Sequence, residues 1–404
     1  SAVNDAQALW TKPRNKVSEE EYKEFYRHVS SDFAEPLSWS HNKVEGKQDY
    51  TSLIYIPSMA PMDLYQRDAS RGIKLYIKRT FIMDDAEQFL PMYLRFVKGI
   101  LDSADLPLNI SREILQKTPL VESMRAALTK RVLDMLSKLA KKDKEKYAKF
   151  WSQFGVVLKE GPSEDHGNKE KIAKLFLFCS SSIDDTAPTV TLDDYISRMN
   201  ENQKKIYYLT GESITSLANS PYLEAFKKHN IEVLLMSDRI DEWMMGYLNE
   251  FKKKQFQDIA KGELDLSEIT GETEKDGKDA KKKISKADEK VISEIKDILS
   301  AKVSEVRSTN RLTHSPACLV VGEHDMGEQM RKIMEAAGQT MPESKPTLEV
   351  NTKHPLVKKI KASKDTKETK MLTQLLFDQA LLSAGRSLED PAAFVKGLNK
   401  LMFS

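Results

Sequence analysis

Arg112 is the side chain whose position in the sequence most needs a chemical explanation. It follows Ser111, a residue type that caps helices well because its hydroxyl accepts a hydrogen bond from a free amide of the first turn. Arg112 is then the first helical residue, where the positive end of the helix dipole disfavours a cation by about 0.3–1 kcal/mol. From the spacing alone we favour a surface arginine paired with Glu113 or another acid.

A second group of chemically active side chains lies between residues 314 and 325. A metal ion could in principle use these residues: His314, Cys318, His324 and Asp325. A buried strand followed by a helix cap explains the same pattern more simply, so we expect no metal site. The sequence also contains no H-E-x-x-H, no G-x-S-x-G and no G-x-x-x-x-G-K-[ST] motif. A self-contained hydrolase or P-loop enzyme is therefore not predicted.

Composition narrows the class of protein further. The 404 residues exceed the roughly 250–300 at which a single core stops growing, which indicates two or three domains. The 63 basic and 61 acidic residues leave a net charge of +2, which argues against a nucleic-acid binder. No apolar run approaches the roughly 18 residues of a membrane span, and the first residues do not resemble a signal peptide. Cys179 and Cys318 have apolar neighbours, so we predict small buried residues of a reducing compartment.

The first half of the chain alternates between strand and helix patterns. Ser18 and Glu21 form a plausible capping box at the start of a helix. A long helix beginning with Pro119 is predicted to connect two α/β units. The predicted elements are a helix at 18–29, strands at 51–57 and 72–82, a helix at 85–98 kinked or broken by Pro91, and the connector at 119–140.

A strand–helix–strand pattern follows at 205–210, 213–229 and 231–237, which predicts a parallel strand pair with a right-handed crossover. Residues 261–290 are then more than half charged, which is typical of a linker or a domain boundary. The remaining predicted elements are a helix at 287–306, strands at 316–321 and 347–350, a helix at 326–337, and two terminal helices.

The two terminal helices carry more apolar residues than one helical face can hold. Gly385 should end the first helix, and Asp390 with Pro391 should begin the second. Pairing with a twofold copy would bury these surfaces in a four-helix bundle. The alternative is a monomer that packs both helices onto its own domain. The expected interface residues are Leu372, Leu375, Leu376, Phe394, Leu398 and Leu401.

Several stretches resemble the ninety-kilodalton heat-shock protein family of ATP-driven chaperones, and most closely its bacterial, HtpG-type members. LPLNISREILQ (106–116) is similar to the catalytic loop of the family's middle domain. The likeness extends over essentially the whole chain. The other similar stretches are ALWT (8–11), EYKEFY (21–26), YTSLIYIP (50–57), FIMDDAEQFLP (81–91) and SDRIDEWMMGYL (237–248).

The resemblance implies a middle-plus-C-terminal portion that lacks the family's ATP-binding domain. Arg112 is similar to the arginine that the family extends to the γ-phosphate of ATP, while Asn109 and Gln116 match its polar companions in that loop. By this resemblance the chain alone is not an enzyme and holds no cofactor, whereas the intact protein uses ATP and Mg²⁺. The resemblance also reverses our preference for a purely structural Arg112.

Two helices carry apolar residues that could contact a client protein. On the first, the stripe of Ile240, Met244, Leu248 and Phe251 is ordinary core, whereas Trp243, Met245 and Tyr247 lie off it. On the second, Asp325 and Glu328 should form a capping box, and methionines line one side. Core packing is the alternative for both helices. The expected client-binding residues are Glu242, Trp243, Tyr247, Met326, Met330, Ile333 and Met334.

The predicted fold is an α/β middle domain of two α/β units joined by a helical connector, followed by an α+β C-terminal domain that ends in a dimerising helix pair. We expect a middle domain at 1–258 (units at about 1–118 and 141–258, connector 119–140), a charged linker at 259–286 and a dimerisation domain at 287–404. The predicted function is a cytoplasmic, homodimeric chaperone that binds non-native clients and co-chaperones, without nucleic acid or membrane. A stand-alone ATPase and a purely structural dimerisation scaffold are the alternatives.

Overall fold

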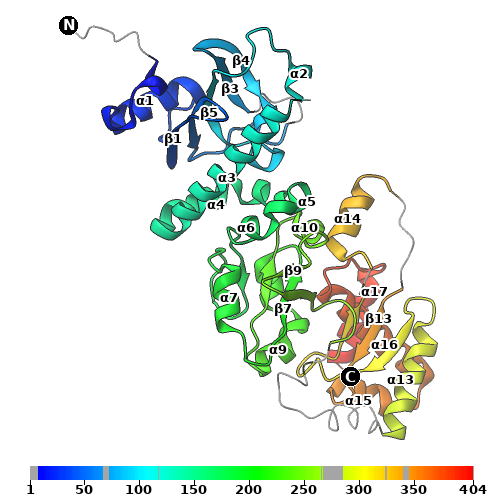
Figure 1. The fold of residues 1–404 in the computed structure, drawn as a ribbon. Coiled ribbons are helices and arrows are strands. Elements are labelled where there is room, and N and C mark those ends of the chain that lie inside the picture. The colour runs from blue at the N-terminus through cyan, green and yellow to red at the C-terminus, as the bar shows by residue number, and fades with distance from the viewer. Residues whose placement is uncertain are drawn as a thin grey trace. The chain divides into compact units, whose positions relative to one another are not determined.

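The computed structural model describes residues 8–66, 72–116, 118–264, 266, 285–323, 325–339 and 345–403, without the side chains of Ile114 and Gln116 (Figure 1). The chain divides into two compact units, Ser1–Leu177 and Phe178–Ser404, and each is described by itself. Helices occur together with β-sheets in the described residues, which confirms a mixed α/β architecture. Among the described helices, none is both long and apolar enough to cross a membrane.

The first unit is built on a five-stranded sheet with the order β1-β2-β5-β3-β4. Neighbouring strands are antiparallel except for β3 and β5, which run parallel. Lys78 and Arg79 both have positive φ and turn the chain between β3 and β4, so the single strand expected at 72–82 is a hairpin. The strands are β1 (Ser38–Val44), β2 (Tyr50–Ile56), β3 (Ile73–Ile77), β4 (Thr80–Ala86) and β5 (Lys98–Ser103).

Aromatic side chains hold the first helix against this sheet. The predicted capping box of α1 is confirmed, because the Ser18 hydroxyl accepts from the Glu21 amide and the Glu21 carboxylate accepts from the Ser18 amide. Tyr22 and Tyr26 on α1 share a buried cluster with residues of β2 and β5. The helices of this unit are α1 (Glu19–Ser30), α2 (Arg112–Gln116), α3 (Pro119–Lys142), α4 (Lys144–Leu158), α5 (Gly161–Glu164) and α6 (Lys169–Ala173).

The helix expected at 85–98 does not form. Strand β4 runs on to Ala86, two 3-10 turns flank Pro91, and the chain enters β5 at Lys98. Proline lacks an amide hydrogen and pushes the preceding residue into an extended conformation. Leu90 accordingly has φ −137° and ψ 144°. The apolar periodicity was therefore overridden by Pro91.

The second unit begins with a five-stranded sheet in the order β6-β8-β7-β10-β9. Strands β7 and β8 are parallel, as predicted, but the helix expected between them is interrupted by a 3-10 turn that starts at Pro221. The elements are β6 (Cys179–Ser180), α7 (Leu192–Arg198), β7 (Lys205–Thr210), α8 (Ile214–Ala218), α9 (Glu224–Lys228), β8 (Leu234–Met236), α10 (Asp241–Met245), β9 (Glu250–Phe251) and β10 (Lys254–Asp258).

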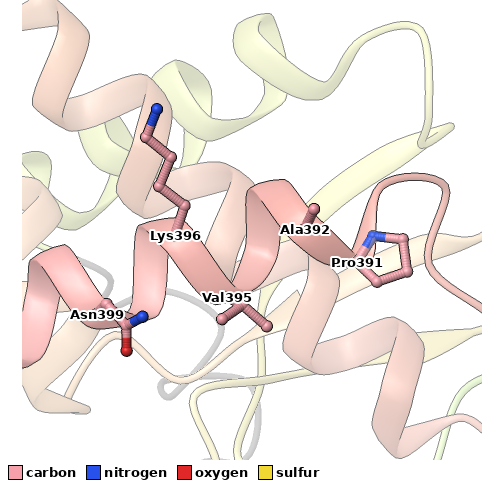
Figure 2. A pocket seen from close by; sticks show the side chains of 5 residues that line it. All are labelled: Pro391, Ala392, Val395, Lys396 and Asn399. Atoms are coloured by element: carbon pink, nitrogen blue, oxygen red, sulfur yellow. The ribbon is translucent and has the colours of Figure 1, made fainter.

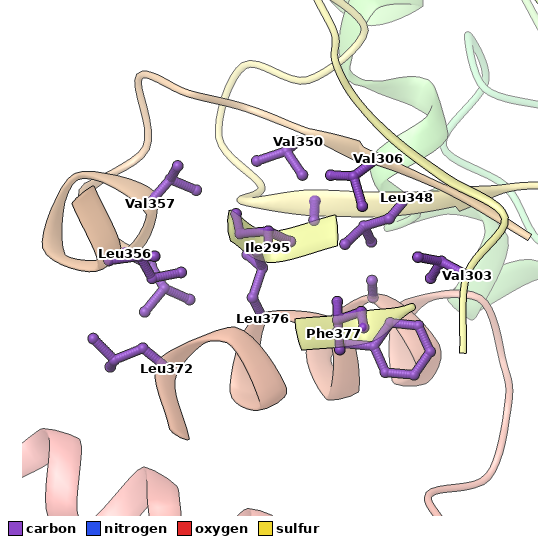
Figure 3. Close-up of a cluster of buried hydrophobic side chains, with 14 of the residues drawn as sticks. Ile295, Val303, Val306, Leu348, Val350, Leu356, Val357, Leu372, Leu376 and Phe377 are labelled. Carbon is purple, nitrogen blue, oxygen red and sulfur yellow. The ribbon is translucent and has the colours of Figure 1, made fainter. Parts of the chain in front are cut away.

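A three-stranded sheet with the order β11-β13-β12 follows. Its apolar side chains share one buried cluster with residues of α13, α15 and α16 (Figure 3). Asp390 caps α17, and Gly385 follows α16 with positive φ, both as predicted. The elements are α13 (Lys286–Leu299), β11 (Glu305–Ser308), β12 (Ala317–Val320), α14 (Glu328–Ala336), β13 (Thr347–Val350), α15 (Pro355–Ala362), α16 (Thr366–Ser383) and α17 (Pro391–Met402).

The two sheets of the second unit also share buried side chains. One cluster combines Tyr207 and Leu235 of the first sheet with Cys318 and Val320 of β12. The core therefore runs across residue 258, where we expected the middle domain to end. Both cysteines of the chain are buried and free, as the sequence indicated.

Two side chains from the segment between β7 and β8, Glu224 and Tyr222, also form hydrogen bonds with the backbone around β12. The carboxylate of Glu224 on α9 accepts hydrogen bonds from the amides of Thr313, His314 and Ser315. Burial raises the pKa of Glu224, but the hydrogen bonds from this loop outweigh it and leave the pKa below its usual value. The hydroxyl of Tyr222 donates to the carbonyl of Leu319 on β12. These bonds tie α9 and its preceding turn to the loop and strand around β12.

Candidate functional site

Buried leucine and isoleucine side chains anchor the loop between β5 and α2. Leu106 and Ile110 are buried, whereas Leu108 between them is exposed. At the start of the loop, the hydroxyl of Ser103 accepts from the amides of Asp105 and Leu106 at 3.2 and 3.4 Å. The loop is therefore fixed at its base while its middle faces solvent.

Helix α2 begins at Arg112, as the sequence predicted. The amide of Leu115 donates to the carbonyl of Ser111 at 3.1 Å, which closes the first turn. The Leu115 side chain is buried and holds this five-residue helix in place. Arg112 is thereby carried on a short helix whose position is set by packing.

The guanidinium of Arg112 is paired with a carboxylate from the neighbouring sheet. Its Nη2 donates to both carboxylate oxygens of Asp85 on β4. This hydrogen bonding with Asp85 raises the pKa of Arg112 further, with smaller contributions from Glu87 and Asp84. The Arg112 side chain is nevertheless 56% exposed. The acid that holds Arg112 in this ion pair is thus Asp85 on the adjacent strand.

The other two predicted catalytic residues occupy different positions. Asn109 is exposed in the same loop, three residues before Arg112. Gln116 is the last residue of α2, but its side chain lies outside the described part of the structure. Asn109 and Arg112 are therefore both exposed, the first in the loop and the second at the start of α2.

Helix α10 is shorter than the apolar stripe from Ile240 to Phe251 suggested. It spans Asp241–Met245, and residues 250–251 form strand β9 instead of continuing the helix. Met245 is buried, although it lies off the stripe expected to face the core. Trp243 is half-buried and Tyr247 is exposed, with their ring centroids 5.0 Å apart. These two aromatic rings form the accessible apolar part of this segment.

Helix α14 starts two residues later than predicted, at Glu328, and the expected capping box is not formed. Asp325 instead accepts from the amide of Gly322 at 3.0 Å, while Glu328 pairs with Arg331 and Arg386. Glu328 is thereby directed toward arginines, which leaves no free carboxylate to reach back to the helix start.

The apolar residues of α14 and of the turn before it are partly accessible. Met326 and Ile333 are each 37% exposed, and Met330 and Met334 are half-buried. This agrees with an apolar side that is only partly used for core packing.

Glu242 does not have the free carboxylate that a direct client contact would need. One of its oxygens accepts from the amide of Gly327 and the other from the amide of Met330 at 2.9 Å. The side chain is only 9% exposed, and Lys261 lies 3.3 Å from it. The prediction that Glu242 binds clients directly therefore needs correction, because its polar atoms are already used inside the chain.

The predicted dimer residues divide into two groups. Leu372, Leu375 and Leu376 are buried in the chain's own core, where α16 packs against β12 and neighbouring helices, so they are not open to a second copy. This part of the prediction is wrong because α16 turns these three leucines inward. The α17 residues Phe394, Leu398 and Leu401 are half-buried.

Several of the accessible apolar residues near the carboxyl end lie on α17. Val395 is 53% and Met402 66% exposed, and Phe403 after the helix is also exposed. On its inner side, α17 approaches α16 closely at Gly397, where an added Cβ would lie 3.1 Å from the Leu375 side chain. An open pocket on the exposed side of α17 is lined by Pro391, Ala392, Val395, Lys396 and Asn399, whose side chains are drawn in Figure 2.

The part of the chain that the structure describes contains no group of three histidine, cysteine or acidic side chains placed to hold a metal ion. His324, one of the four residues considered for a metal, lies outside the described residues.

A family model described as Hsp90 protein matches residues 1–404. The chain belongs to the Hsp90 family. Members of the Hsp90 family are ATP-hydrolysing chaperones, which agrees with the resemblance seen in the sequence. This Hsp90 chain carries the loop around Arg112 as an exposed, anchored element, and accessible apolar residues occur on or next to α10, α14 and α17 as well as in other parts of the chain.

Sequence reasoning missed two residues of these sites. Asp85 lies in the quoted stretch FIMDDAEQFLP, but its approach to Arg112 depends on how β4 and α2 are packed. Gly327, the residue before α14, has no side chain that could cap the helix. The absence of a capping side chain at this position was the signal in the sequence that another residue supplies the cap.

Proposed function

We propose that this Hsp90 chain handles non-native client proteins and that Arg112 acts on ATP held by a nucleotide-binding domain of the intact protein. The observation that carries the catalytic part is the exposed guanidinium of Arg112 on a loop anchored by buried residues. A cation presented in this way can neutralise negative charge that develops on the transferred phosphoryl group. The resemblance of residues 106–116 to the family's catalytic loop supports the assignment.

Asp85 competes with a phosphoryl group for Arg112 in this role. Nη2 of the guanidinium is paired with Asp85, so a phosphoryl group would share the guanidinium with that carboxylate or displace it. An exposed ion pair contributes only about 0–1 kcal/mol, so its loss is a small barrier compared with the stabilisation that such arginines provide. We assign Asn109 and Gln116 to orienting Arg112 or the attacking water. ATP with Mg²⁺ is the substrate expected in the intact protein.

Client binding is proposed for the apolar residues on α10 and α14. Trp243 and Tyr247 supply adjacent aromatic rings, and the α14 segment supplies flexible, polarizable methionine side chains. Such surfaces accept many different apolar sequences, as a chaperone requires. The contributing α14 residues are Met326, Met330, Ile333 and Met334.

Dimerisation is proposed through α17 with a second copy of the chain. Its half-buried Phe394, Leu398 and Leu401 are joined by the more exposed Val395 and Met402. Phe403 extends the same apolar end of the chain. This replaces the interface first expected, since α16 is used for the core.

The quoted sequence stretches also support a bacterial, HtpG-type chaperone of the cytoplasm with co-chaperone partners. By the same proposal, residues 1–404 do not bind or hydrolyse ATP by themselves, because the sequence contains no phosphate-cradling glycine loop.

Substitution of Arg112 in the intact protein tests the catalytic part. Arg112→Ala should lower ATP turnover by a factor of about 10³ while leaving ATP affinity within about twofold, because the contact matters mainly in the transition state. Arg125→Ala is the matched control, since Arg125 is also an exposed arginine of this unit, paired with Glu164. Turnover within about twofold of wild type would remove Arg112 from the mechanism. Micromolar ATP binding by residues 1–404, measured by calorimetry, would contradict the proposal that ATP is held by another domain of the intact protein.

A further inference from the structure

Helix α14 is capped by a side chain from a distant part of the sequence. Its N-cap residue, Gly327, has no side chain to accept hydrogen bonds from the first turn. Glu242, 85 residues earlier, accepts from the amide of Gly327 with one carboxylate oxygen and from the amide of Met330 with the other. Free amides at a helix start favour a negative charge both by hydrogen bonding and through the helix dipole. Glu242 therefore completes α14 while it belongs to α10.

The surroundings of Glu242 balance its charge and restrict its movement. Its side chain is only 9% exposed, and the ammonium group of Lys261 lies 3.3 Å from it. Lys261 also donates to the carbonyl of Asp325, just before α14, at 3.0 Å. A buried carboxylate needs both a counter-charge and hydrogen-bond donors, and this one has them. The cap is thus a paired, largely buried group instead of a passing surface contact.

Gly327 leaves the space that the carboxylate occupies. A Cβ added at this position would lie 2.7 Å from the carboxyl carbon of Glu242. Its backbone has φ −76°, which any residue can adopt, so backbone strain does not require a glycine here. The requirement is steric: any side chain at position 327 would push Glu242 away from the helix.

The other connections of α14 are more exposed or less charged. Lys332 pairs with Glu212 at 2.6 Å and donates to the carbonyl of Gly385, and Glu212 is well exposed. Gln329 donates to the carbonyl of Gly211. Glu328 also pairs with Arg386 at 2.9 Å, with both side chains 19% exposed. Glu242, at 9% exposed, is therefore the most buried charged group among these links of the helix, and exposed ion pairs contribute little to stability.

We propose that Glu242 is a positioning residue that fixes α14 beside α10 and so assembles one client surface from two separate segments. The inference rests on the proposed client-binding function. Trp243 follows Glu242 directly in the sequence. Of the two amides that Glu242 binds, one belongs to Gly327, which follows Met326, and the other belongs to Met330 itself. The Glu242 carboxylate therefore brings aromatic rings and methionines together without touching the client. The occupant that fits this surface is an apolar segment of a non-native polypeptide.

Two substitutions break the link from opposite sides. Glu242→Ala removes the carboxylate, and Gly327→Ala displaces it while leaving every charge in place. Loss of a helix cap typically corresponds to about a threefold to thirtyfold change in an equilibrium constant. Hydrogen exchange at the Met330 amide should accelerate by a factor in that range in both variants of the full chain. Binding of reduced, carboxymethylated lactalbumin, a permanently non-native protein, should weaken by a similar factor.

The matched control is Glu335→Ala, which removes an exposed acid from the same helix and leaves Glu242 unchanged. It should alter neither exchange at Met330 nor client affinity beyond about twofold. A third variant, Glu242→Ala with Gly327→Asp, gives α14 a cap of its own but no link to α10. Exchange at Met330 should then slow again while client affinity stays low.

Three outcomes would overturn the positioning role. Weaker client binding with unchanged exchange at Met330 would mean that Glu242 contacts the client directly. Faster exchange with unchanged client affinity would mean that the position of α14 is irrelevant to binding. Recovery of client affinity in the variant with its own cap would mean that only helix formation matters. If the wild-type chain does not bind the non-native probe, the client-binding function fails, whereas the exchange data still report on the cap.

Discussion

Arg112 and Asp85, 27 residues apart, form an ion pair in which one guanidinium nitrogen donates to both carboxylate oxygens. Asp85 is mostly covered, whereas more than half of the Arg112 side chain is exposed. The Asp85 carboxylate occupies Nη2 of this guanidinium, and its negative charge would repel a phosphoryl group bound beside it. The carboxylate therefore competes with the substrate that we propose for Arg112.

Removing this competition should raise ATP turnover. In the intact protein, Asp85→Asn keeps the size of the side chain but removes the charge that holds Arg112. An exposed ion pair is worth up to about 1 kcal/mol, so turnover should rise by up to about fivefold. Steady-state ATP hydrolysis measures the effect. In an Arg112→Ala background the same substitution should have no effect, and an equal rise there would show that Asp85 acts independently of Arg112.

The sequence predicted elements best where a local signal agreed with the packing. The capping box of Ser18 and Glu21, the parallel β7–β8 pair and the Asp390 cap of α17 all formed as expected. Predictions from apolar periodicity were wrong where a proline or a turn intervened, as at Pro91. In that case the missing amide hydrogen overrode the amphipathic pattern.

The sites were predictable to a smaller extent. The position of Arg112 at a helix start followed from Ser111, a residue type that caps helices well. The partners Asp85 and Glu242 depend on which segments pack together, and no local pattern in one sequence contains that information. The inward orientation of Leu372 and Leu376 was missed for the same reason, since it depends on the sheet beneath α16.

The exposed residues of α14 offer a test of client binding that does not disturb the core. Replacing Met326 and Ile333 together by serine removes apolar side chains that are each 37% exposed. Affinity for a non-native client should fall by about tenfold, while the melting temperature changes by less than about 3 °C, since surface substitutions usually cost within 0.5 kcal/mol. Fluorescence anisotropy with a labelled client and calorimetry measure the two quantities. Unchanged affinity would exclude these residues from the surface.

Buried Asp258 should make stability depend on pH. Burial raises its pKa from 3.8 to about 6, although the charge of Lys261 partly opposes this, and Glu242 and Arg311 also act on it. The unfolded chain loses the proton near pH 4 and the folded chain near pH 6. This carboxyl group therefore makes folding less favourable as pH rises through that window, and its effect is constant above it.

Asp258→Asn should accordingly stabilise the second unit at pH 7.5 and much less at pH 4.5. An asparagine oxygen can still accept the hydrogen bond from the Ala260 amide that the carboxylate now accepts at 2.9 Å. Urea unfolding of the variant and wild type at both pH values measures the difference. An equal effect of Asp258→Asn at both pH values would show that the charge of Asp258 is not responsible.

The revised dimer interface leads to the last prediction: arginine substitutions on α17 and on α16 should have different effects. Val395 and Met402 are exposed on α17, so Val395→Arg with Met402→Arg should leave each protomer folded. An obligate interface commonly buries about 2,000 Å² or more, and two unpaired charges buried within it would strongly disfavour association. This variant should sediment as a monomer at micromolar concentration with its melting temperature nearly unchanged after correction for dissociation. By contrast, Leu372→Arg places a charge in the core and should lower the stability of the protomer itself by several kcal/mol. A double α17 variant that remains dimeric would place the interface elsewhere on the chain.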